Sequence, residues 1–312
     1  MIVNTRVSFE SLQVARGTRD CVLPPQWVLD LIGRAEGGGA GEANGVEVNE
    51  AGEFALVSAR VADAVALDAG MLERRVAEVY GAIVEKIGTL FANRPVRLWN
   101  HIPSIHERME ARRNRYMIFN AGRYRAFSLH YGGPRAFDRK LATASGIGHG
   151  GRDLIVHCLS TQGVAIAVEN PRQIAPHRYS ARYGTLPPCF ARAMVLPDSG
   201  LILVGGTASI KGEESLHGAS LDLQWQETLT NLASVVETAH AKASAAGARG
   251  RDEWLGQFRE VRVYYPRAAD GDGLAAMGRE AFGDRCRIEM RRADLCRSEL
   301  LVEIEGVATL KT

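Results

Sequence analysis

The sequence predicts an α+β protein built from two modules of similar topology. Its 312 residues are enough for about two domains, and 46% of them are hydrophobic, so each module can bury a core. The order strand, long helix, strand, shorter helix, strand occurs twice, although the residues of the two halves do not align visibly. We place the boundary near Gly150, between an N-terminal module of residues 1–150 and a C-terminal module of residues 151–312.

The first module begins with about fifty loosely organised residues. A tract at 36–45, rich in glycine and without periodicity, indicates a flexible surface loop. A strand is predicted over 53–61, and apolar residues three or four apart over 72–90 predict a helix of about twenty residues with one buried stripe. We expect further strands over 96–102 and 116–124, with a basic helical stretch between them, and the second strand enters a glycine turn that carries an arginine.

The second module repeats this order. A strand over 201–204 leads through a Gly-Gly-Thr-Ala-Ser segment to a long helix, whose apolar residues lie at helical spacing over 225–236. The remaining predicted elements are a strand over 261–265, a helix over 273–282, a strand over 287–290 and a final strand that ends at Gly306.

The final strand carries two acids among apolar residues. Period-two geometry puts Leu301, Glu303 and Glu305 on one face, and Val302 and Ile304 on the other. Burying an acid on so apolar a strand costs free energy unless the acid is paired with a cation or serves the protein's function. Desolvation would raise its pKa and keep a proton available near neutral pH, as a general acid requires. A solvated sheet edge would account for both acids equally well.

Charge and composition argue against several classes of protein. The net charge is +2, and acidic and basic residues are interspersed, so we expect neither a nucleic-acid nor a membrane partner. No run of about 18 apolar residues occurs, and the first residues lack the pattern of a secretory signal. We therefore expect a soluble, cytoplasmic protein.

The five cysteines are an odd number without CxxC spacing, which predicts reduced thiols. One of them, Cys296, lies seven residues before Glu303. A lone cysteine is more often inert and buried than reactive, and its neighbour Arg297 would favour a thiolate only if the two side chains converge.

Several familiar motifs are absent or incomplete. Residues 146–151 match GxGxxG formally, but an apolar strand over 154–158 follows where a dinucleotide-binding helix is needed. His101 and His106 share a segment without a third ligand, and neither HExxH nor GxSxG occurs. We therefore expect neither a nucleotide cofactor nor a metal.

Two arginines are placed where an apolar strand meets a turn. Arg123 follows a glycine after one predicted strand, and Arg192 precedes the strand over 193–196. This placement suits a bidentate grip on a carboxylate, and a structural ion pair is the alternative for each. Tyr179 and Tyr183 are available either to donate hydrogen bonds or to pack.

Read in order, these segments resemble the chorismatase family (3-hydroxybenzoate synthase-like), the chorismate-hydrolysing relatives of the YjgF/RidA-like superfamily. The resemblance covers most of the chain from about residue 54 onward. The segments that carry it are 97–103, 119–124, 183–184, 187–193, 206–210, Gln224 with Glu227 and Asn231, and 294–306.

The resemblance implies a fold and a site. In each half it implies a YjgF-like (chorismate mutase-like) module with a mixed sheet backed by two helices, and it places most of the active site in the C-terminal module. The family's catalytic glutamate falls on Glu303, and Cys296 stands where the aromatising members have a cysteine. The implied substrate-binding positions are Arg123, Tyr183, Arg192, Gly206 and Thr207.

The implied activity is cleavage of the enolpyruvyl ether of chorismate. Arginines can hold this dianion by its carboxylates, and protonation of the enol-ether methylene by Glu303 would give an oxocarbenium-like centre that collapses to release pyruvate. The reaction requires no metal or organic cofactor. Cys296 and Gly206 are typical of the branches that aromatise, so we expect 3-hydroxybenzoate, alone or with 4-hydroxybenzoate. Residues 211–214 and 218–220 differ from the family's usual sequence, and this difference bears on which hydroxybenzoate is formed.

Two other functions stay open. One is a non-catalytic YjgF-like protein that binds small carboxylates at the same arginines. The other is an imine deaminase, because Arg287 precedes the last strand roughly where smaller members carry a carboxylate-binding arginine. Those members are trimers, and a duplicated module can replace contacts between subunits. The resemblance therefore implies a monomer or a homotrimer. Hydroxybenzoates serve several routes of secondary metabolism, and the pathway is left open.

Overall fold

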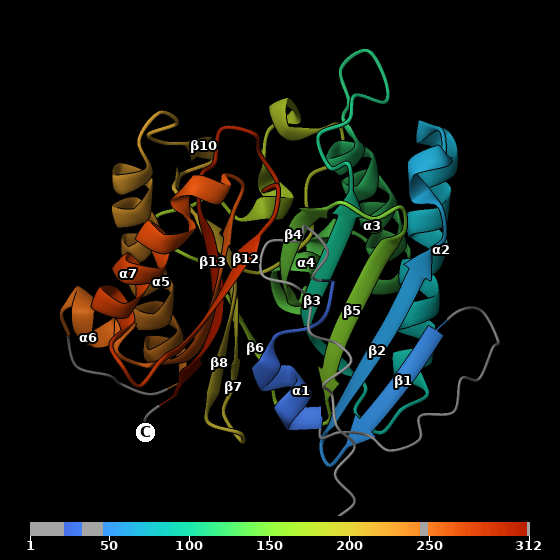
Figure 1. Ribbon diagram of the computed structural model, residues 1–312. Helices are drawn as coiled ribbons and strands as arrows, with labels where there is room; N and C mark the ends of the chain where they lie inside the picture. Colours follow the sequence, from blue (N-terminus) through green and yellow to red (C-terminus); the bar gives the residue numbers. More distant parts are fainter. Residues whose placement is uncertain (1–21, 33–45, 244–248, 311–312) are drawn as a thin grey trace, which may run out of the picture.

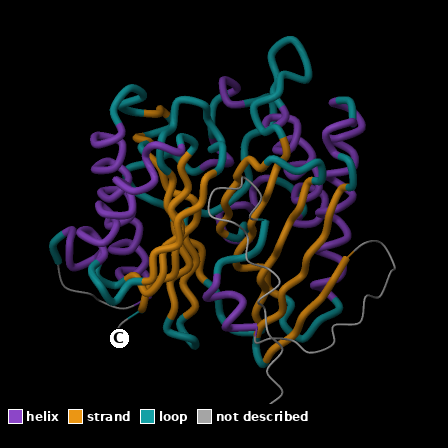
Figure 2. The backbone as a smooth tube through the Cα atoms, in the orientation of Figure 1, coloured by secondary structure: helices purple, strands orange, loops and turns teal. Residues whose placement is uncertain are grey.

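The computed structural model describes residues 22–32, 46–243 and 249–310, and shows two α+β modules whose sheets lie between outer layers of helices (Figures 1 and 2). The predicted loop at 36–45 and Cys21 lie outside the described residues. Each sheet is covered by helices on the side away from the other module. The α+β prediction is confirmed.

The first module holds a five-stranded sheet in the order β1-β2-β5-β3-β4. β3 and β4 pair in parallel, and the other neighbours are antiparallel. Its main elements are β1 (Val46–Ala51), β2 (Phe54–Val61), α2 (Ala69–Gly88), β3 (Arg94–Pro103), α3 (Arg115–Tyr131), α4 (Phe137–Lys140), β4 (Thr143–His149) and β5 (Leu154–Thr161). The helix α1 (Gln26–Ile32) packs near β1 and β2.

The second module holds a six-stranded sheet in the order β12-β11-β13-β8-β7-β6. Its elements are β6 (Ile166–Val168), β7 (Ala193–Leu196), β8 (Leu201–Ala208), β9 (Ile210–Lys211), β10 (Glu214–Ser215), α5 (Leu221–Ala243), α6 (Arg251–Leu255), β11 (Phe258–Tyr265), α7 (Gly271–Phe282), β12 (Arg287–Arg292) and β13 (Glu303–Thr309). If β7, β8, β11, β12 and β13 are matched to β1 to β5 in chain order, the strand order and the single parallel pair, β11 with β12, are the same in both sheets. The repeated topology read from the sequence is confirmed.

The boundary predicted near Gly150 falls between β4 and β5. β5 pairs with β2 and β3, so the strands of the first sheet extend to Thr161, past Gly150. The next strand, β6, belongs to the second sheet. We propose that the two modules meet between Thr161 and Ile166.

The prediction of a strand over 116–124 is wrong, because these residues lie within the helix α3. The side chain of Asn114 caps this helix by accepting a hydrogen bond from the Met117 N–H. Gly122 lies against α2 so closely that a Cβ there would be 2.5 Å from the Glu73 carbonyl oxygen. The helix contacts α2 on one side and the space between the modules on the other, so it lacks the single apolar stripe that identifies a surface helix.

The two sheets meet in a core of their own. Phe54, Trp99 and Leu159 from the first sheet pack with Leu203 and Val307 from the second. Separate apolar cores lie between each sheet and its helices. Side chains on the inner faces of the sheets are therefore buried between the modules, and those at one end of the interface line a cavity.

Candidate active site

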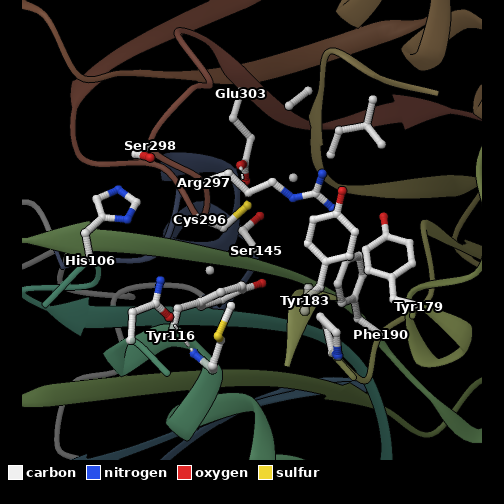
Figure 3. A pocket seen from close by; sticks show the side chains of 18 of the residues that line it. His106, Tyr116, Ser145, Tyr179, Tyr183, Phe190, Cys296, Arg297, Ser298 and Glu303 are labelled. Carbon is white, nitrogen blue, oxygen red and sulfur yellow. Dashed lines mark hydrogen bonds between the residues drawn. The ribbon is translucent and has the colours of Figure 1, made fainter. Parts of the chain in front are cut away.

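A cavity with a volume of about 240 Å³ opens where the inner faces of the two sheets separate. Tyr116 and Ser145 of the first module line it, together with Tyr183, Cys296 and Glu303 of the second (Figure 3). More of its lining residues come from the second module than from the first. The two modules thus share one site.

Glu303 is the first residue of β13, which pairs with β11 on one side and β8 on the other. The residue is only 4% exposed, so the alternative of a solvated sheet edge is wrong. On β8, Gly206 leaves room for the carboxyl group, because a Cβ at this position would collide with Glu303 Oε1. Burial, with the negative charge of Glu305 as the next cause, raises the pKa of Glu303 to about 8. The side chain is therefore protonated at neutral pH.

Glu305 lies on the same face of β13 as Glu303, as the sequence predicts. Val302 and Ile304 pack on the other side, in the core beneath the helices of the second module. Glu305 is almost fully buried and forms an ion pair with Arg97 of β3, at 2.6 Å between Oε2 and Nη2. The two acids thus differ: one is paired with a cation, and the other faces the cavity.

The Cys296 thiol lies 3.8 Å from Glu303 Oε2 and donates a hydrogen bond to it. Burial and the neighbouring Glu303 raise the pKa of Cys296 to about 12. The charge of Arg297 opposes this shift, but burial and Glu303 are the larger causes. Its guanidinium carbon lies 3.9 Å from the centre of the Tyr183 ring, and its Nη1 donates to the Glu213 carbonyl at 2.8 Å. Cys296 is therefore a neutral thiol.

Arg123 and Arg192 line the cavity as buried cations without an ion-pair partner among the described residues. Arg123 donates to Asn120 Oδ1 at 2.8 Å, and Arg192 donates to the Tyr179 hydroxyl at 2.6 Å. Both guanidiniums lie against the ring of Phe190. The Nε atom of each has no hydrogen-bond partner within the described structure.

A structural ion pair is thus not what holds these two arginines. The charge of Arg192 acts on Glu169 and Glu303 without an ion pair, and burial raises the pKa of these two acids to about 7 and about 8. Burying a cation without a counterion is costly, and an anionic ligand in the cavity would offset that cost. Arg123 comes from α3 rather than from a turn after a strand, and it reaches the cavity from that helix.

The structure brings some of the other predicted residues to the cavity and not others. The Tyr183 ring lines it, and its hydroxyl lies 3.4 Å from Glu214 Oε2. Thr207 faces the opposite side of β8 from Gly206, does not line the cavity, and donates its hydroxyl to the Gly205 carbonyl at 2.9 Å. Arg287 lies on the edge strand β12, away from the cavity, in ion pairs with Asp30 and Glu260.

The site also contains residues that the sequence reading missed. Tyr116 was assigned to a strand, and its ring lines the cavity from α3. Ser145 lies beside the GxGxxG-like segment, which begins in β4, runs past its end at His149 and is followed by a strand as expected. The capping residue Asn114 was the local signal for α3. Nothing local marks Ser145, because it reaches the site through the pairing of β4 with β3.

The remaining groups considered from the sequence do not form a metal site. His106 lines the cavity, whereas His101 is buried between the sheets near His149 and His157. Within the described ranges, no group of three or more His, Cys, Asp or Glu side chains is arranged to hold a metal ion. None of the helices in the described part of the chain has the length and hydrophobicity that a bilayer span requires.

Comparison with known proteins adds independent information. Residues 33–160 match the N-terminal domain model of FkbO/Hyg5-like chorismatases. A 3-hydroxybenzoate synthase of Streptomyces hygroscopicus is 31% identical over 274 residues, which cover 86% of this chain and 77% of that protein. A chorismatase of Streptomyces rapamycinicus is 31% identical over 238 residues, 74% of this chain and 69% of that protein.

A solved structure agrees with these matches. The crystal structure of a chorismatase superposes with a TM-score of 0.76 at 25% sequence identity, and the alignment covers 86% of this chain and 78% of that one. Similarity of this extent, in sequence and in fold, reaches across both modules and the cavity between them. The chain belongs to the chorismatase family.

Proposed function

We propose that this protein is a chorismatase that cleaves the enolpyruvyl ether of chorismate to pyruvate and a hydroxybenzoate. The observation that carries the proposal is that one cavity is lined by a protonated, buried acid, Glu303, and by two buried arginines, Arg123 and Arg192. The named activities of the relatives, chorismatase and 3-hydroxybenzoate synthase, support the same reading.

The proposed role of the arginines follows from the charge of the substrate. Chorismate carries two carboxylates, and a guanidinium binds a carboxylate with two parallel hydrogen bonds. Arg123 and Arg192 each retain an unused Nε donor within the described structure. Holding the dianion at these groups would fix the enolpyruvyl side chain relative to Glu303, which turns protonation into a step within one complex.

The proposed role of Glu303 is to donate the proton that starts the reaction. Its proton passes to the methylene carbon of the enol ether, which leaves an oxocarbenium-like centre, and cleavage of the bond between the ring carbon and the ether oxygen then releases pyruvate. The ring, left with a positive charge, loses a proton to become aromatic, and this loss balances the proton that Glu303 gave. Pyruvate and hydroxybenzoate together contain all the atoms of chorismate, so no net water is consumed. A pKa of about 8 keeps this acid protonated, yet ready to donate, at neutral pH.

Incubation with chorismate tests the proposal. We expect equimolar pyruvate and an aromatic acid, with the acid identified by chromatography against 3- and 4-hydroxybenzoate standards. Absence of pyruvate above the uncatalysed background would contradict the proposal. In that case tight binding without turnover would favour a carboxylate-binding protein, and ammonia release from an amino-acid-derived imine would favour a deaminase.

The nature of the product is expected to depend on Cys296. Its thiol donates to Glu303 and lines the cavity, so it would face a bound ring that must lose a proton to become aromatic. Replacing Cys296 by alanine should therefore raise the fraction of the dihydroxylated cyclohexadiene, whose formation consumes one water, while pyruvate release continues. Cys286→Ala is the matched control, because this buried thiol lies away from the cavity. An unchanged product ratio in Cys296→Ala would refute this role.

The proposal includes the oligomeric state of the protein, its partners and its location in the cell. We propose a monomer or a homotrimer that acts on a small molecule without a nucleic-acid or membrane partner. We also propose a cytoplasmic location, since the four described cysteines are free thiols. No cofactor is assigned a role in the chemistry.

A further inference from the structure

We propose that Glu305, held as a carboxylate by Arg97, is a positioning residue that keeps the proton on Glu303. This inference rests on the proposed function, because it concerns the acid of that reaction. Glu305 does not line the cavity, so it would act on the substrate only through Glu303.

Glu305 is surrounded by donors that fix it as an anion. Besides Arg97 it accepts hydrogen bonds from Trp99 Nε1 at 2.9 Å, from the Tyr264 hydroxyl at 3.1 Å and from the Ser145 hydroxyl. The residue is 1% exposed. All four partners donate to its carboxylate oxygens, which matches the acceptor-only form of the group. Its negative charge is thus built into the fold next to Glu303.

Arg97 is the counterion, and it comes from the other module. Its Nη2 also donates to the Ser145 hydroxyl at 2.7 Å and its Nη1 to the Leu98 carbonyl at 3.1 Å, while its guanidinium carbon lies 4.8 Å from the centre of the Trp99 ring. Both side chains of the pair are only 2% exposed. The first module therefore supplies the charge that allows a second carboxylate to remain buried beside the catalytic one.

The backbone brings the two acids together on one face. In the pairing of β13 with β8 the register shifts between Ile304 and Gly306, so Glu305 lies at an irregularity of the ladder. Glu303 and Glu305 are two residues apart on a strand, so their carboxyl groups share a face and interact electrostatically. A like charge at this separation disfavours ionisation of the neighbour.

The other charged and titratable groups that face Glu303 come from several elements. Arg97 and Arg192 favour its ionised form, as does the hydrogen bond from Cys296. Tyr116 of α3 is neutral, because burial raises its pKa. Among these groups Glu305 is the largest charge effect on Glu303, and it opposes both arginines. Burial is the largest cause of the raised pKa of Glu303, and without Glu305 burial alone would oppose the two guanidiniums.

The pH dependence of kcat/KM tests the inference. A protonated acid is required, so activity should fall on the alkaline side as Glu303 ionises. Glu305→Gln removes the neighbouring negative charge but leaves Arg97, so we expect this alkaline limb to move to lower pH by about one unit or more. Removing both charges in Glu305→Gln/Arg97→Met should place the limb between those of the wild type and the single variant.

The double variant also guards against loss of folding. Glu305→Gln alone leaves a buried guanidinium without a counterion, whereas replacing both partners with neutral groups is commonly tolerated. If only the double variant folds, its limb should still lie below that of the wild type. Tyr264→Phe is the matched control, since it removes a neutral donor to Glu305 and should leave the limb in place.

The possible failures are distinguishable. A wild-type protein that does not cleave chorismate at any pH would end the proposed function. An active wild type whose alkaline limb is unmoved in Glu305→Gln and in the double variant would overturn the inference. A limb that moves equally in Tyr264→Phe would also overturn it, because it would assign the effect to packing rather than to charge.

Discussion

Replacing Glu303 by glutamine is expected to lower the rate of pyruvate release by about 10³-fold while chorismate still binds. The amide has the shape of the acid but no transferable proton, and the arginines that would hold the substrate are untouched. The measurement is kcat from single-turnover pyruvate release, together with the Kd for chorismate from calorimetry. Retained turnover would place the acid elsewhere.

Glu299→Gln is the matched control for this variant. Glu299 lines the same cavity, but it is exposed and bound to the Ser215 hydroxyl at 2.8 Å, so its loss should leave most of the activity. A large loss in both variants would point to a general effect of charge in the cavity rather than to proton donation by Glu303.

The raised pKa of Glu303 should also be detectable in the thermal stability of the protein, without any measurement of turnover. Because the pKa of Glu303 is raised to about 8, the wild type is less stable at neutral and alkaline pH than it would be with an uncharged residue there. The contribution that this group makes at acid pH is lost as pH rises between its ordinary value, 4.5, and about 8. Glu303→Gln should therefore unfold at a higher temperature than the wild type at pH 8, with a smaller difference near pH 5. An equal difference at both pH values would contradict the raised pKa.

Much of the fold could be read from the sequence, because its signals are local. The helix α2 carries its apolar residues at regular spacing, and Leu72, Val76 and Ile83 are buried as that spacing predicts. The alternation on β13 likewise separates Glu303 and Glu305 from Val302 and Ile304. Periodicity of this kind indicates one buried face, so it predicts an element correctly when that helix or strand has a single buried face.

The helix α3 shows where local signals fail. Its apolar and aromatic residues surround Asn120 and Arg123, both of which are buried. Since one side of the helix packs on α2 and another lines the cavity, polar and apolar residues are both buried and no stripe remains. An amino-acid pattern that is typical of strands then dominates the prediction.

The electrostatic arrangement of the site was out of reach for a different reason. Arg97 and Glu305 are 208 residues apart in the chain and meet only because the inner faces of two sheets pack together. Burial and the neighbouring charge of Glu305 together raise the pKa of Glu303, and no spacing in the sequence carries that information. The resemblance to chorismatases led to the proposal that Glu303 is the acid, whereas the structure supplies the physical reason for its raised pKa.

Replacing either Arg123 or Arg192 by methionine is expected to reduce kcat/KM for chorismate by about 100-fold without destabilising the protein. Each variant would lose charge-assisted hydrogen bonds to a carboxylate, which accounts for a loss of this size in the transition state. The free protein, however, would lose a buried cation that has no ion-pair partner among the described residues. Its Tm should therefore equal or exceed that of the wild type, measured without ligand at neutral pH.

Arg115→Met separates this expectation from the ordinary cost of removing a buried arginine. Arg115 is also buried on α3, but it donates to the Ala64 carbonyl at 2.6 Å and pairs with Glu107 at 2.6 Å. Its loss leaves those acceptors without a donor, so the Tm should fall by several degrees. If Arg123→Met and Arg192→Met lower the Tm as much as Arg115→Met does, the two cavity arginines are structural. If they keep the Tm but abolish the rise in Tm that chorismate gives the wild type, an anion is what these cations bind, because binding to the folded state alone raises the Tm by mass action.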